Sequence, residues 1–144
     1  MDIEKLRQEA ILAKQRAYAP YSGFRVGAAV LGDDGRIHVG ANVECASYGG
    51  TICAERAAVA AAVSSGARRI LAVAVSGDTP QSLTPCGICR QVLAEFAEPE
   101  TPVWCGDGMD RFVRLTLEAL LPYAFTPRVL TETTPDAADG DTRL

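Results

Sequence analysis

The sequence predicts a single α/β domain in which helices cover both faces of one mixed β-sheet. The expected elements follow one another as helix, hairpin, helix, strand, helix and two further strands, an order typical of such a sheet. The segment RILAVAVS, residues 69–76, is almost continuously apolar, as expected for a strand that is covered on both faces. The length of 144 residues matches one domain with a substantial core.

The first elements are predicted to be a helix and a hairpin. Apolar residues recur at intervals of three and four over residues 2–18, which predicts one amphipathic helix that ends before Pro20. Residues 25–31 and 36–44 are rich in Val, Ile and small residues and flank the turn 33–35, so they predict a β-hairpin. His38, the single histidine, falls in the second strand, and we expect it on the surface of the hairpin.

Two further helices are predicted to begin beside cysteines. An alanine-rich run starts near Cys53 and ends at Gly66, and PCGICRQVLAEFA opens the second helix at Pro85. Beyond it, residues 103–105 and 112–115 predict weaker strands, and residues 116–121 a short helix. Residues 131–144 lack apolar content, so we expect a folded domain over residues 1–130 and a disordered tail after it.

Charge and composition exclude several classes of protein. The net charge is −4 and the basic residues are scattered, which argues against a nucleic-acid partner. The chain shows neither an apolar run of about 20 residues nor a secretory signal, so we expect a cytoplasmic protein without membrane contact. Five cysteines, an odd number without an export signal, favour metal binding or catalysis over a disulfide framework.

Cys53, Cys86 and Cys89 are the candidate metal ligands. Cys86 and Cys89 share one face of a first helical turn, and helix N-termini favour the thiolate form that zinc requires. Two facing helix starts can supply three thiolates to one tetrahedral Zn²⁺, which leaves a fourth position open for a water whose pKa the metal lowers. Because three thiolates overcompensate the metal charge, we hypothesise that the Arg56 guanidinium donates hydrogen bonds to thiolate sulfur.

A structural zinc site is the alternative at this point. One CxxC motif is shared by redox proteins and four-cysteine structural sites, and Cys45 or Cys105 would complete such a site. A closed four-ligand site would have no use for Glu55. A carboxylate two residues after a metal ligand is costly to bury without a task, and this favours the catalytic interpretation.

Cys53-Ala54-Glu55 followed by Pro85-Cys86-x-x-Cys89 resembles the zinc deaminase pattern, in which His/Cys-x-Glu precedes Pro-Cys-x-x-Cys. Over about residues 17–126 the chain is similar to the small homotetrameric cytidine deaminases. Further motifs that carry the similarity are Ala19-Pro20-Tyr21-Ser22-x-Phe24, Asn42-Val43-Glu44, Ser47-Tyr48 and Leu120-Leu121-Pro122-x-Ala124-Phe125. The resemblance implies a three-layer α/β/α sandwich around a five-stranded mixed sheet.

The same resemblance implies roles for individual residues. Glu55 would be the catalytic proton carrier beside one zinc ion per chain. The implied substrate-binding residues are Phe24, Asn42, Glu44, Tyr48, Ala54 and Phe125. Asn42 and Glu44 would bind the ribose, chiefly its 3′-hydroxyl, and Phe24 the base. Tyr48 and Phe125 would reach a neighbouring subunit's site in a homotetramer.

The expected function is hydrolytic deamination of free cytidine and 2′-deoxycytidine to uridine and 2′-deoxyuridine plus ammonia, by a zinc-activated water, in pyrimidine salvage. The alternatives are a deaminase of a modified cytosine nucleoside and a non-catalytic zinc- or nucleoside-binding module. Glu44 would repel a phosphate, so nucleotides are expected to be poor substrates. Cys45, Gly50 and Cys105 depart from the residues expected in the family and leave the catalytic set intact.

Overall fold

The computed structural model describes residues 1–131. Of the predicted disordered tail, residues 131–144, all but Thr131 lies outside the described residues. The elements are α1 (Ile3–Lys14), β1 (Val26–Gly32), β2 (Ile37–Ala41), η1 (Tyr48–Gly50), α2 (Ala54–Ser64), β3 (Ile70–Gly77), α3 (Gly87–Phe96), β4 (Pro102–Gly106), β5 (Phe112–Thr116), α4 (Leu117–Leu120) and α5 (Pro127–Thr131). Within residues 1–131, no helix is both long and apolar enough to cross a membrane.

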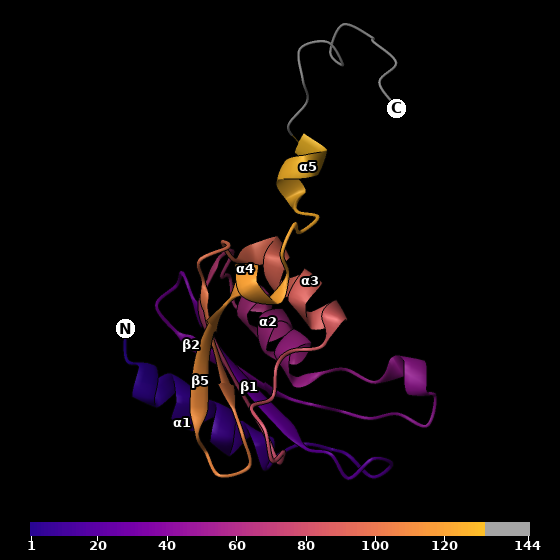
Figure 1. Cartoon of the computed structure of the whole chain (residues 1–144). Helices are drawn as coiled ribbons and strands as arrows, with labels where there is room; N and C mark the ends of the chain where they lie inside the picture. Colours follow the sequence, from indigo (N-terminus) through magenta and orange to yellow (C-terminus); the bar gives the residue numbers. More distant parts are fainter. Residues whose placement is uncertain (132–144) are drawn as a thin grey trace, which may run out of the picture.

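Across residues 1–131, five strands form one mixed sheet in the order β2-β1-β3-β4-β5. Strand β1 pairs antiparallel with both β2 and β3, β3 pairs parallel with β4, and β4 pairs antiparallel with β5. Helix α1 covers one face of this sheet, and α2 and α3 cover the other (Figure 1). The three-layer α/β/α sandwich and its mixed sheet are therefore confirmed.

Strand β3 supplies both halves of the core because successive side chains of a strand point to opposite faces. Val73 and Val75 join the large cluster beneath α2 and α3, whereas Ala72 and Ala74 join the smaller cluster beneath α1. All four side chains are fully buried. This explains why the segment is apolar at nearly every position.

The first helix and the second strand are shorter than predicted, because tertiary backbone pairing takes over their ends. Helix α1 ends at Lys14, and Tyr18 instead forms a bridge with Val43. The Tyr18 N–H donates to the Asn42 carbonyl at 2.9 Å, and the Glu44 N–H donates to the Tyr18 carbonyl at 2.8 Å. Strand β2 ends at Ala41, and residues 42–52 lead irregularly toward α2.

The prediction that His38 lies on the surface is wrong. Its side chain is only 7% exposed, and Nε2 lies 2.9 Å from Asp34 Oδ2 in the hairpin turn. Gly40, two residues further along β2 and therefore on the same face, lies directly against the backbone of α2. Helix α2 thus covers the face of β2 that the sequence pattern predicted to be exposed.

Candidate metal and substrate site

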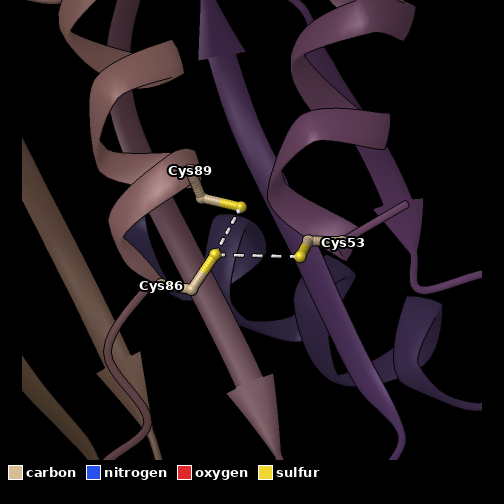
Figure 2. A group of neighbouring side chains, drawn as sticks. All are labelled: Cys53, Cys86 and Cys89. Atoms are coloured by element: carbon tan, nitrogen blue, oxygen red, sulfur yellow. Dashed lines mark hydrogen bonds between the residues drawn. The ribbon is translucent and has the colours of Figure 1, made fainter. Parts of the chain in front are cut away.

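The amino ends of α2 and α3 bring the three candidate metal ligands together. Cys53 is the N-cap residue of α2, Cys86 is the N-cap residue of α3, and Cys89 lies in the first turn of α3. Figure 2 shows the three sulfur atoms pointing toward one another from the two helix starts. The Cys86 Sγ lies 3.8 Å from the Cys53 Sγ and 3.5 Å from the Cys89 Sγ.

These distances fit a zinc ion. Tetrahedral coordination with Zn–S bonds of about 2.3 Å places two sulfur ligands about 3.8 Å apart. All three sulfur atoms lie within 4.8 Å of one another, and within residues 1–131 no further His, Cys, Asp or Glu joins this group. Cys45 is exposed and Cys105 is buried in β4, so neither completes a closed site. Three ligands leave the fourth position of one zinc ion for water or substrate.

The surroundings of the thiols explain why the site suits a cation. Burial raises the pKa of the Cys53 thiol and, together with the negative charge of Glu55, the pKa of the Cys89 thiol. Burial acts in the same direction on Cys86, but hydrogen bonds from the Cys89 N–H and the neighbouring thiols outweigh it and lower the pKa of Cys86. A divalent cation between the sulfur atoms stabilises all three thiolates at once.

Arg56 lies beside the thiol cluster, as hypothesised from the sequence. Its Nη2 is 3.8 Å from the Cys53 Sγ and donates to the Thr51 carbonyl at 3.2 Å. The first turn of α2 therefore places a fixed positive charge against one ligand of the site. This position allows Arg56 to offset part of the negative charge of three thiolates.

Glu55 lies in a pocket that opens beside the sulfur atoms. Its side chain is only 5% exposed, and burial raises the pKa of its carboxyl group. The pocket has a volume of about 170 Å³ and is lined by Phe24, Val26, Asn42, Thr51, Cys53, Ala54, Glu55, Leu83, Thr84 and Cys86. Val26, Thr51, Leu83 and Thr84 were not predicted from the sequence to line the site. Thr51 and Thr84 each lie two residues before a metal ligand, Cys53 and Cys86, and this spacing was an available signal.

Asn42 holds the backbone at the mouth of this pocket. Its Nδ2 donates to the Phe24 carbonyl at 2.8 Å, and its Oδ1 accepts from the Val26 N–H at 2.9 Å. The side chain of Asn42 is 7% exposed, whereas that of Phe24 is 38% exposed. The structure therefore places the Phe24 ring at the rim of the pocket, and the side-chain amide of Asn42 holds the Phe24 backbone in place.

Glu44 and Tyr48 lie in an adjoining hollow, which they share with Tyr21, Ser22 and Thr51. Thr51 borders both hollows. Hydrogen bonds from the hydroxyl and N–H of Ser22 lower the pKa of Glu44. Tyr48 is 74% exposed, and its ring meets that of Tyr21 edge-on with 5.8 Å between the centroids.

Phe125 does not reach the pocket of its own chain. Its side chain is 57% exposed, and its carbonyl accepts a hydrogen bond from Gln91 Nε2 at 2.7 Å. Of the predicted substrate-binding residues, it alone borders neither hollow. The resemblance had implied that it serves a neighbouring subunit.

Arg90 is a structural contributor that the sequence analysis did not single out. Its guanidinium donates to the Pro85 carbonyl at 2.7 Å, to Thr84 Oγ1 at 3.0 Å and to the Leu120 carbonyl at 2.7 Å. It therefore ties the segment before Cys86 to α4. Its place directly after Cys89 in the motif was a possible signal.

An open set of three thiols at two facing helix starts, beside a buried carboxylate in an α/β/α sandwich, defines a zinc-dependent hydrolytic enzyme with the deaminase fold. The profile of the cytidine and deoxycytidylate deaminase zinc-binding region matches residues 1–105. The chain belongs to the cytidine deaminase family.

Individual relatives agree with this assignment. The cytidine deaminase of Halalkalibacterium halodurans is 49% identical over 126 residues, which cover 88% of this chain and 96% of the relative. The crystal structure of cytidine deaminase from Burkholderia pseudomallei matches with a TM-score of 0.82 and 42% identity, over 87% of this chain and all (100%) of the other. That of the Mycobacterium tuberculosis enzyme matches with a TM-score of 0.74 and 48% identity, over 87% and 98%.

Proposed function

We propose that this chain hydrolyses free cytidine and 2′-deoxycytidine to uridine and 2′-deoxyuridine with release of ammonia, as a step of pyrimidine salvage. The observation that carries the proposal is the position of the buried Glu55 carboxylate in the same pocket as Cys53 and Cys86. A structural zinc site would require neither an open position nor this carboxylate. Relatives named cytidine deaminase, 49% and 48% identical to this chain, support the substrate class.

Glu55 is the group that moves protons in this scheme. When bound by Cys53, Cys86 and Cys89, the zinc supplies a Lewis acid that makes water nucleophilic near neutral pH. Glu55 first accepts a proton from the attacking water and delivers it to ring N3, which makes C4 more electrophilic. It then delivers the second water proton to the departing 4-amino group, so oxygen remains on C4 and ammonia leaves. Burial raises the pKa of Glu55, which suits a carboxyl group that both accepts and donates.

The two adjoining hollows support recognition of a nucleoside rather than a free base. Phe24 lines the hollow that contains Glu55, in a position to receive the pyrimidine. Asn42 borders the same hollow and Glu44 the adjoining one, and we assign both to the ribose, where the Glu44 carboxylate is in a position to accept from a sugar hydroxyl. The Glu44 carboxylate would repel a 5′-phosphate. We therefore assign nucleosides rather than nucleotides as substrates.

A homotetramer with active sites at subunit interfaces completes the proposal. Tyr48 is 74% exposed and Phe125 57% exposed, and large aromatic rings of this kind are enriched in protein interfaces. In the assembly, Phe125 would cover the pyrimidine in a neighbour's pocket and Tyr48 would reach a neighbour's sugar. Light scattering of the zinc-loaded protein tests the assembly, and a monomer with full activity would contradict it.

The reaction is tested by following the ultraviolet absorbance of cytidine mixed with zinc-loaded protein, together with the release of ammonia. Glu55→Gln serves as the matched control, because it keeps the shape of the side chain and removes its proton transfer. We expect this variant to lose about 10²- to 10⁴-fold in kcat while it still binds zinc. Near-normal turnover by the variant would refute the role of Glu55.

The same assay with other substrates separates the alternatives. Deoxycytidine is expected to react, whereas CMP is expected to react poorly. No turnover of any of the three by protein with one zinc per chain would contradict the proposal and favour a modified nucleoside or a binding module.

A further inference from the structure

The hydroxyl group of Ser22 contacts both Glu44, which the proposed function assigns to the sugar, and the backbone of Phe24, which it assigns to the base. Ser22 Oγ donates a short hydrogen bond to Glu44 Oε2 and accepts one from the Phe24 N–H at 3.0 Å. The Ser22 N–H and the Tyr21 N–H donate to Glu44 Oε1 at 3.1 and 3.0 Å. A single exposed serine therefore contacts both the carboxylate and the backbone of the aromatic residue.

The loop around Ser22 has a shape that depends on these contacts. Gly23 has a φ of +69°, a conformation that glycine adopts readily, and it turns the chain so that the Phe24 N–H meets Ser22 Oγ. The Phe24 carbonyl is held by Asn42 Nδ2 at 2.8 Å. The backbone of Phe24 is thus fixed on both sides, by Ser22 at the amide and by Asn42 at the carbonyl.

The same contacts limit how Glu44 can bind a ligand. A carboxylate offers about four acceptor positions. The Tyr21 and Ser22 N–H groups and the Ser22 hydroxyl occupy three of them. Within residues 1–131, one position therefore remains that can accept from a ligand hydroxyl group, in a direction set by the loop.

We propose that Ser22 is a positioning residue that fixes the Glu44 carboxylate and the Phe24 ring relative to each other, so that one loop recognises a sugar hydroxyl and a base together. The identity of sugar and base rests on the proposed function, whereas the coupling rests on the contacts of this loop. Ser22 lies on the surface, so its replacement by alanine leaves the core unchanged.

The kinetic test compares cytidine with 3′-deoxycytidine, which lacks one sugar hydroxyl, in the wild-type protein and in Ser22→Ala. For cytidine, we expect kcat/KM to fall about ten- to hundredfold, mainly through KM, because a hydrogen bond to a charged group is lost. For 3′-deoxycytidine, we expect a smaller loss of about threefold, since only the Phe24 contact is affected. Ser65→Ala, at an exposed serine that caps the end of α2, is the matched control and should leave both values unchanged.

Equal losses for the two substrates would overturn the coupling, as would no loss for either. Amide hydrogen exchange over residues 19–25 provides a second readout that needs no substrate. Ser22→Ala should speed exchange at Phe24 about tenfold at an unchanged melting temperature, because its amide loses its acceptor. Unchanged exchange would refute the role of Ser22. Faster exchange in a protein without cytidine turnover would support the loop contacts and refute the proposed substrate.

Discussion

Replacing Gly40 by alanine should push the site-bearing helix α2 away from the sheet. A Cβ at this position would lie 2.4 Å from the Ala58 nitrogen and 2.6 Å from the Ala54 carbonyl oxygen, whereas ordinary contacts begin at 3.4 Å. Both neighbours are backbone atoms, so relief requires the helix to move by about 1 Å. The moving segment carries Cys53 and Glu55 at its amino end.

Two losses follow from this displacement. Overpacking of this kind costs about 1–3 kcal/mol in the free energy of unfolding. A misplacement of about 1 Å in a catalytic site costs about 10²-fold in rate. Gly40→Ala should therefore lower the stability of the zinc-free protein, lower kcat about 10²-fold and speed the release of zinc to a chelator.

Gly27→Ala is the matched control on the opposite face of the sheet. Its Cβ would lie 2.2 Å from the Ala10 carbonyl oxygen and 2.3 Å from the Lys14 nitrogen, a comparable clash with the backbone of α1. Helix α1 carries none of the proposed site residues. Gly27→Ala should therefore lose similar stability in urea unfolding but retain zinc and kcat. If both variants lose zinc equally, or Gly40→Ala keeps the wild-type kcat, the position of α2 does not set the site geometry.

Three further predictions concern charged groups. Arg90→Met should release zinc to a chelator at least tenfold faster, because the segment before Cys86 loses two of its hydrogen bonds; a wild-type release rate would contradict this. Arg56→Gln should bind one zinc ion but lose about ten- to hundredfold in kcat, since the charge beside the thiolates is removed; unchanged kcat at full zinc content would refute it. Hydrogen bonds from the N–H groups of Arg111 and Met109 hold the pKa of Asp107 below its ordinary 3.8. The stabilisation from Asp107 should therefore be complete above about pH 5 and disappear as the pH falls through its folded-state pKa. Urea unfolding of wild type and Asp107→Asn between pH 6 and pH 3 should show two stabilities that converge at low pH, and a constant difference would contradict the assignment.

Local spacing was sufficient to predict the metal-binding residues and the order of the elements. Cys86 and Cys89 lie three residues apart at a helix start, and their shared face follows from helical geometry alone. Glu55 follows Cys53 by two residues in the first turn of α2, so its place beside the metal ligands was also local information. The continuous apolar character of β3 showed that both of its faces are covered.

Features that depend on contacts between distant segments could not be predicted in this way. The pairing of Tyr18 with residues 42–44 ends both α1 and β2 early, because these backbones satisfy each other's hydrogen bonds. His38 is buried because α2 packs on strand β2. The hydrophobic periodicity of the sequence does not indicate this contact.

The sequence by itself determined the three metal-binding cysteines and the place of Glu55 beside them, since helix starts and motif spacing are short-range properties. The tertiary structure alone decided how those residues are held. The hydrogen bond between Ser22 and Glu44 joins residues that are 22 positions apart in the sequence, and the one between Arg90 and Leu120 joins residues that are 30 positions apart. Such contacts form only when the sheet and helices assemble, because their partners are brought together by packing rather than by chain proximity.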